Sequence, residues 1–247
     1  MKNFAILDIM DIARALGENP KEATPYNVFE FLKTNYLKPS GGSFNYNASI
    51  EALRKGLQGK LSLTDAINHV TSVGAPFGHK YNKAVVNAIW PVIEENTAKA
   101  YPLKFTAVAL RRLNGKTIYM SIKAPVITVT SNQFISIKLT NFRNTFAPNH
   151  DQKTFMMSAV KQVLARDDFE EATVDLIEAR STDGQLERSL SRINSSDVEL
   201  YELERVEDLL TIYTQGIEML FDNGFETKEA NLSRFRVVDP NAPDLFG

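Results

Sequence analysis

The dipeptide Asn114-Gly115 separates two segments in which apolar and polar residues alternate. A period of two indicates a β-strand with one buried face, and Asn-Gly is the strongest short-range signal for a two-residue hairpin turn. The pattern therefore predicts a β-hairpin from residues 103–113 and 117–122. Alternation continues over 126–129 and 134–139, so the centre of the chain is expected to supply three to four strands.

Helical patterns flank this β-rich centre on both sides. Before it, apolar residues recur at helical spacing over 5–16, from Pro25, and over 48–57, 62–72 and 80–99. After it, the patterns predict a helix over 150–166, strands over 172–180 and 186–193, and a long helix that begins at Ser195 or Ser196 and ends at Asn223-Gly224. We expect an α+β or α/β fold in which an N-terminal helical region precedes a central mixed β-sheet flanked by helices.

The same patterns divide the chain into three parts. Residues 1–78 are expected to form a helical cap or docking region, 79–224 an α/β core, and 225–247 an extended C-terminal tail. The chain has no cysteine, which excludes disulfide bonds, thiolate metal sites and cysteine nucleophiles. It also has no run of about 18 apolar residues, so we expect no membrane span and a cytoplasmic, bacterial protein.

Charge is unevenly distributed along the chain. Residues 96–150 contain no Asp or Glu, and the segment 101–165 carries nine Lys and Arg against one Asp, although the whole chain has a formal net charge of −2. Positive charge is concentrated in this way where a surface meets phosphate or another polyanion. The alternative is that acidic surface helices flank a basic sheet that has no binding role, and the charge pattern leaves both interpretations open.

Basic side chains in or near the predicted strands are the first candidates for nucleic-acid binding: Arg111, Arg112, Lys123, Lys138 and Arg143. The acid-free run also removes the carboxylates that a metal-dependent enzyme would need in this segment. We therefore expect no bound metal and no cofactor, and we expect nucleic acid as the partner, DNA rather than RNA.

The order of the elements resembles the PD-(D/E)xK, or restriction-endonuclease-like, superfamily, and within it the RecB and lambda-exonuclease branch. The resemblance covers about 80–220, where a helix, a β-meander, a second helix and a further strand follow one another. Glu94 and Glu95 lie on the first of these helices, and Ser136-Ile137-Lys138 falls where the family carries its (D/E)xK tripeptide. His150-Asp151-Gln152 opens the second helix, so the resemblance adds Gln152, at the family's Gln position, to the nucleic-acid-binding candidates.

The chain departs from the family at both acidic positions. It has Ala124-Pro125 where the family has an Asp on its second strand, and Ser136 where the family has its second acid. Mg²⁺ is a hard ion that needs anionic oxygen ligands, so a Ser hydroxyl and a Lys cannot hold it. The resemblance therefore implies a pseudo-nuclease that keeps a groove for nucleic acid, or a docking surface, without catalytic residues.

Alternation also predicts how individual side chains point. Asp175 should share a face with Ile177 while Glu178 points the other way, so a regular strand cannot bring both carboxylates to one metal. One strand earlier, Ile137 should be buried and Lys138 should look outward or into a cleft. We therefore expect replacement of Lys138 by Ala to leave stability almost unchanged.

These observations favour a non-catalytic nucleic-acid-binding protein, or an accessory subunit of a nucleic-acid-processing or phage-defence (antiviral) complex, that uses a basic β-sheet face and has a protein partner. Two alternatives stay open. One is an active Mg²⁺-dependent nuclease whose carboxylates come from distant segments, such as Glu94 or Glu95 with Asp175. The other is a purely protein-binding scaffold whose acidic C-terminal part docks a basic partner.

Overall fold

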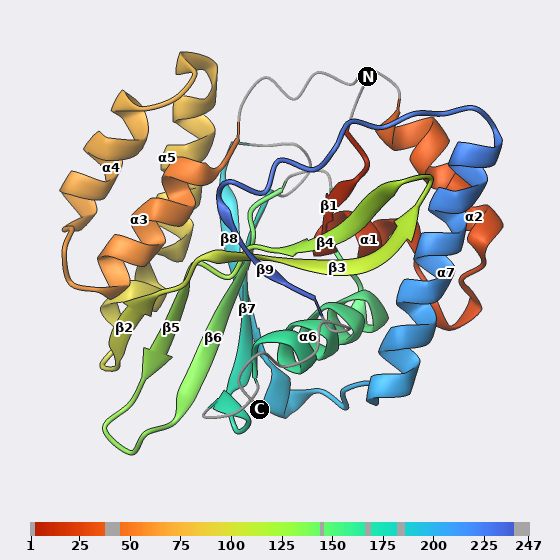
Figure 1. The fold of residues 1–247 in the computed structure, drawn as a ribbon. Coiled ribbons are helices and arrows are strands. Elements are labelled where there is room, and N and C mark those ends of the chain that lie inside the picture. The colour runs from red at the N-terminus through yellow and green to blue at the C-terminus, as the bar shows by residue number, and fades with distance from the viewer. Residues whose placement is uncertain (1–2, 38–44, 144–145, 166–168, 182–185, 240–247) are drawn as a thin grey trace.

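Two mixed β-sheets lie at the centre of the protein, and helices cover them (Figure 1). The structure is a computed structural model that describes residues 3–37, 45–143, 146–165, 169–181 and 186–239. It confirms the expected mixed class, with N-terminal helices followed by sheet flanked by helices, but the β-rich centre of the chain divides between the two sheets.

The first sheet has the strand order β1-β4-β3-β9. Its strands are β1 (Ile6–Asp8), β3 (Phe105–Leu113), β4 (Lys116–Ile122) and β9 (Phe235–Val238). β3 and β4 form the expected hairpin, in which Asn114 and Gly115 both have positive φ angles, of 47° and 76°, as a type I′ turn requires. β1 and β9 come from opposite ends of the chain, and each pairs in parallel with its neighbour.

These two short strands are where the first sheet differs from the sequence expectation. Ile6–Asp8, which we expected to be helical, pairs with β4, and Asp8 then caps the shorter helix α1 (Ile9–Ala15) by accepting from the backbone N–H of Met10. Phe235–Val238, within the expected tail, pairs with β3. Segments of three or four residues are too short to show the alternation of apolar and polar residues that marks a strand in the sequence. They become strands only because they pair with a neighbouring strand in the folded protein. The end of the tail, 240–247, lies outside the described residues.

The second sheet has the strand order β2-β5-β6-β7-β8. β2 (Lys99–Pro102), β5 (Val126–Val129) and β6 (Ile135–Asn141) are antiparallel neighbours. Helix α6 (His150–Leu164) then crosses over to β7 (Thr173–Ser181), which is parallel to β6, and β8 (Arg188–Asn194) forms the antiparallel edge. A crossover helix is the usual connection between parallel neighbouring strands.

Helices cover both faces of the second sheet. α3 (Asn47–Leu57), α4 (Leu63–Ser72) and α5 (Pro76–Glu94) form a layer on one face, where Leu53 and Ile89 pack against Ile177 of β7. α6 lies on the opposite face and shares the larger core with the first sheet. The expected boundary between residues 78 and 79 falls inside α5.

Of the remaining helices, the first and the last pack against the first sheet, and the second packs against these two helices. In chain order, the remaining helices are α1, α2 (Pro25–Phe31), which continues into one turn of π-helix (Leu32–Tyr36), and α7 (Leu203–Asp222). Single 3₁₀ turns occupy Pro20–Glu22 and Ser195–Asp197, so α7 begins later than the sequence predicts. It ends at Asn223-Gly224 as expected, and Gly224 takes a φ of 79°. None of the helices in the described ranges combines the length and the hydropathy needed to cross a membrane.

Candidate functional site

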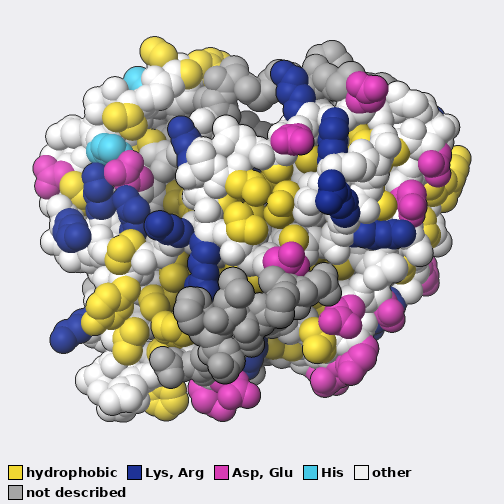
Figure 2. Space-filling view, in the orientation of Figure 1, with side chains coloured by type: hydrophobic (Ala, Val, Ile, Leu, Met, Phe, Trp, Pro, Cys, Tyr) yellow, Lys and Arg dark blue, Asp and Glu magenta, His cyan; other side chains and the backbone are white. Residues whose placement is uncertain are grey.

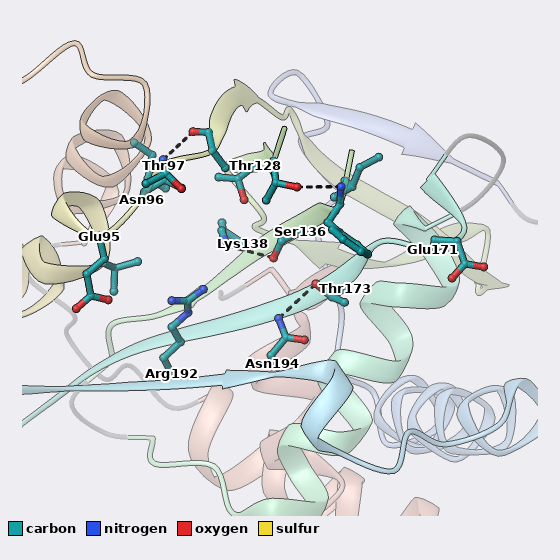
Figure 3. Close-up of a pocket in the computed structure, with 16 residues that line it drawn as sticks. Glu95, Asn96, Thr97, Thr128, Ser136, Lys138, Glu171, Thr173, Arg192 and Asn194 are labelled. Atoms are coloured by element: carbon teal, nitrogen blue, oxygen red, sulfur yellow. Dashed lines mark hydrogen bonds between the residues drawn. The ribbon is translucent and has the colours of Figure 1, made fainter. Parts of the chain in front are cut away.

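A cavity of about 240 Å³ opens over the second sheet beside the C-terminal end of α5 (Figure 3). We name it the polar pocket because most of the side chains that line it are polar. Its floor comes from neighbouring strands and its rim from the end of α5 and the segment before β7. The polar side chains are Glu95, Asn96, Thr97, Thr128, Thr130, Ser136, Lys138, Glu171, Thr173, Arg192 and Asn194.

Strand register explains why these side chains converge. Thr128 on β5 lies opposite Ser136 on β6, and Ser136 lies opposite Thr173 on β7. Side chains at paired positions of adjacent strands point to the same face of the sheet. A row of three hydroxyls from three strands therefore crosses the floor of the polar pocket.

Lys138 belongs to this floor but is buried. Its Nζ donates to Oγ of Ser136 at 3.1 Å and to Oδ2 of Asp175 at 2.7 Å, and its side chain is only 5% exposed. Asp175 occupies the position of β7 that faces Lys138, so the ion pair follows directly from the register. This ion pair and the burial of Lys138 argue against the expectation that it can be removed at almost no cost, and they predict a loss of stability instead. The other half of that expectation is confirmed, because Ile137 is buried on the opposite face.

Asp175 is fully buried between two cations. Besides Lys138, Arg192 of β8 binds it: Nε donates to both carboxylate oxygens, at 2.9 and 2.8 Å, and Nη2 lies 2.7 Å from Oδ2. Burial raises the pKa of Asp175, but the hydrogen bonds and charges of Arg192 and Lys138 outweigh burial and hold that pKa below its usual value. The carboxylate therefore stays ionised, with donors on both of its oxygens.

The two cations also affect each other. Burial lowers the pKa of Lys138, Asp175 opposes this effect, and the nearby charge of Arg192 adds to the lowering. The hydrogen bond to Asp175 raises the pKa of Arg192 against the effect of burial, and the charges of Asp175 and Glu95 raise it further. When Lys138 and Arg192 are both protonated, the floor of the polar pocket carries two positive charges and the one negative charge of Asp175.

A second buried carboxylate lies on the opposite face of β7. Glu178 accepts from Nδ2 of Asn141 at 3.1 Å, and its Oε2 lies 2.7 Å from Nζ of Lys153 on α6 and 2.6 Å from Nη2 of Arg180. Asp175 instead faces the α3–α5 layer, so the two carboxylates point to opposite faces as alternation predicts. Across the part of the chain that the structure describes, no group of three or more His, Cys, Asp or Glu side chains could hold a metal ion.

The sequence-based candidates lie in different parts of the structure. Arg111 and Arg112 are exposed on β3 of the first sheet, where Nη1 of Arg111 lies 3.2 Å from Oε2 of Glu218 on α7. Lys138 is in the second sheet. The acid-free run therefore does not form one continuous basic face.

Two further candidates bind carboxylates near the N-terminus. Nζ of Lys123 lies 3.0 Å from Oδ2 of Asp8, and Arg143 donates to Asp11 and lies 3.8 Å from Asp8. These acids come from outside the acid-free run, so the sequence does not reveal that they neutralise its cations.

Gln152 has a structural role in the described chain. It is buried, shares a capping box with Asn149, and donates through Nε2 to the carbonyl oxygens of Ala13 and Gly17 at 3.3 and 2.9 Å. Its side-chain amide thus fixes the start of α6 against α1 and does not face the polar pocket.

A second cavity, of about 470 Å³, lies where α3 meets the segments that precede β3 and β9. We name it the basic groove because Arg54, Lys104 and Arg234 line it, and Lys104 and Arg234 are exposed. The one carboxylate that lines it, Glu51, is already paired, with Lys55 at 2.8 Å among its partners. Figure 2 shows a diagonal band of Lys and Arg side chains on this face, running from α3 toward the middle of the molecule.

Sequence reasoning missed several residues of these two sites. No sequence signal marks Thr128, because the turn after β5 is defined by features of the structure: Gln133 has a φ of 64°, and the backbone N–H of Thr130 donates to the carbonyl of Phe134. That turn sets the register that places Thr128 opposite Ser136. No local signal points to Arg192 or Arg234, because both lie outside the acid-free run.

Comparisons with known proteins add little. No protein family model matches the chain, and no curated protein matches it. A solved structure described as "Crystal structure of SSO0001" is similar over 89% of this chain and 78% of that chain, with 11% sequence identity and a TM-score of 0.37. Similarity at this level carries no argument about function.

Proposed function

We propose that this protein binds nucleic acid through the basic groove without cleaving it, as a cytoplasmic accessory subunit of a nucleic-acid-processing or phage-defence complex. The convergence of Arg54, Lys104 and Arg234 from three distant segments carries the proposal. Clustered cations in a concave surface attract a phosphate backbone. The single carboxylate in the groove weakens this attraction little, because Lys55, at 2.8 Å, already neutralises Glu51.

The composition of the polar pocket supports binding without cleavage. Ser136 and Lys138, from the tripeptide that resembles (D/E)xK, both line it, and Thr128 lies opposite Ser136. Neutral hydroxyls are poor ligands for Mg²⁺, and the oxygens of Asp175 are taken up by Lys138 and Arg192. A pocket of this kind can contact phosphate through its cations. Two carboxylates, Glu95 and Glu171, line it, but among the described residues they belong to no group of three or more His, Cys, Asp or Glu side chains that could hold a metal ion to activate water.

Binding of nucleic acid through the basic groove is tested by titrating labelled DNA, as a duplex and as a single strand, with the protein at several salt concentrations. For the duplex, the double variant Lys104→Glu, Arg234→Glu should lower the slope of log affinity against log salt by about 1.8, or about 0.9 for each lost phosphate contact. The matched control is Lys21→Glu, Lys228→Glu, which makes the same charge change at exposed positions outside the groove. Equal slopes in the two double variants would contradict the assignment of the groove.

The absence of cleavage is tested by incubating the protein with single- and double-stranded DNA and RNA in the presence of Mg²⁺ or Mn²⁺. We expect all substrates to stay intact. Cleavage that is lost in Glu95→Ala or Asp175→Ala would favour an active nuclease and overturn the proposal.

A further inference from the structure

An aromatic pair lies at the end of the hairpin formed by α4 and α5, in which Phe77 is exposed and Tyr81 is half-buried. Phe77 is 56% exposed, and its ring centroid lies 5.5 Å from that of Tyr81, with the ring planes inclined by 52°. Positions 77 and 81 are four residues apart on α5, so both side chains lie on one face of the helix. Figure 2 shows hydrophobic side chains gathered at this end of the hairpin.

Lysines accompany the aromatic pair. Nζ of Lys80 lies 5.6 Å from the ring centroid of Phe77 and 5.1 Å from that of Tyr81, and Lys83 is exposed one turn further along the helix. Residues 66–93 contain no Asp or Glu, so neither α5 before Glu94 nor the end of α4 brings a carboxylate to these lysines. The end of the hairpin therefore combines the exposed ring of Phe77 and the half-buried ring of Tyr81 with positive charge.

We propose that Phe77 and Tyr81 form a stacking platform for unpaired bases of single-stranded nucleic acid, with Lys80 and Lys83 contacting its phosphates. The inference rests on the proposed nucleic-acid binding and specifies the strand form that is bound. Every unpaired base offers a flat π-face to an aromatic ring, whereas a duplex keeps its bases stacked on one another. Two exposed lysines, with no Asp or Glu in residues 66–93 and with the nearby Glu51 bound by Lys55, favour a polyanion over a protein partner as the occupant of this patch.

The test measures binding of a dT oligonucleotide of about 20 nucleotides, and of a duplex, by fluorescence anisotropy at about 50 mM salt. Phe77→Ala should weaken oligonucleotide binding about tenfold and leave duplex binding unchanged, while Phe77→Trp should preserve both. Lys80→Gln, Lys83→Gln should lower the single-strand salt slope by about 1.4, or about 0.7 for each lost contact. Tyr26→Ala, at a 60% exposed aromatic position on α2, is the matched control and should change nothing.

The outcomes separate this inference from the proposed function. If the unmodified protein binds the oligonucleotide and Phe77→Ala binds it equally well, the platform is wrong and the basic groove still stands. If the unmodified protein binds neither oligonucleotide nor duplex, both are overturned. A third outcome is that the unmodified protein self-associates with rising concentration in sedimentation, that Phe77→Ala does not, and that both bind the oligonucleotide equally well. This result would show that the patch is a contact between copies of the chain, and it would overturn the platform.

Discussion

The ammonium group of Lys138 lies 2.7 Å from the carboxylate of Asp175, on two parallel strands that are in register at these residues. Both side chains are buried. Removing one member of such a pair leaves a charge in the protein interior with fewer partners, which costs more than the intact pair contributes to stability. Lys138 is therefore part of the structural core of the second sheet.

Lys138→Ala should lower the free energy of unfolding by roughly 2–4 kcal/mol, because Arg192 offsets only part of the charge of Asp175 that remains. Urea unfolding monitored by circular dichroism measures the effect. The control is Lys104→Ala, an exposed lysine whose removal should change stability by no more than about 0.5 kcal/mol. Equal effects of the two substitutions would show that the buried pair does not contribute as proposed.

Glu178→Ala should cost roughly 3–5 kcal/mol, because it leaves the buried ammonium of Lys153 without its carboxylate partner. Arg180→Ala should cost less, since the Arg180 side chain is 34% exposed and its removal leaves Glu178 with Lys153 and Asn141. The same unfolding assay ranks the two variants. The reverse order of stabilities would contradict the assignment of Lys153 as the main partner.

Acid stability should depend on Asp8. Burial raises the pKa of Asp8, but the charges of Lys123 and Arg143 and the backbone N–H of Met10 outweigh burial and hold that pKa below its ordinary value. A carboxyl group with a depressed folded-state pKa contributes stability above its unfolded-state pKa of about 3.9 and loses that contribution as the pH falls through the folded-state value. Unfolding free energies measured from about pH 7 downward should therefore fall more steeply below about pH 4 in the unmodified protein than in Asp8→Asn. Parallel curves would rule out this contribution.

Gln152→Ala should separate a structural role from a nucleic-acid-binding one. The substitution removes half of the capping box and the hydrogen bonds to the carbonyls of Ala13 and Gly17, so it should cost about 1–2 kcal/mol. The salt slope of DNA binding should stay unchanged, because the side chain is buried against α1. A weaker salt slope with unchanged stability would restore Gln152 as a contact for nucleic acid.

Arg111→Glu, Arg112→Glu tests whether nucleic acid extends along β3. We expect weaker duplex binding, with the salt slope reduced by about one unit, because Glu218 already neutralises Arg111 and only Arg112 is available to phosphate. Salt titrations alongside the basic-groove variant measure the difference. An unchanged slope would remove β3 from the binding surface, and a reduction of about two units would show that Glu218 does not compete with phosphate.

The elements that depend on contacts within a few residues could be predicted from the sequence. Asn114-Gly115 determined the β3–β4 hairpin, and Ser62 with Asp65 determined the start of α4, because turn geometry and capping hydrogen bonds are local. Alternation also determined that Asp175 and Glu178 face opposite sides of β7, since the side-chain period of a strand follows from its backbone.

Which distant segments of the chain meet is seen only in the three-dimensional structure. Arg192 reaches Asp175 because β8 pairs with β7, and Arg234 joins Lys104 in the basic groove because β9 pairs with β3. The charge pattern of the sequence placed a basic surface along 96–150, but pairing with Asp8 and Glu218 neutralises part of it. These partners are far apart in the chain, and long-range pairing depends on sheet order and packing, which a local pattern of residues does not encode.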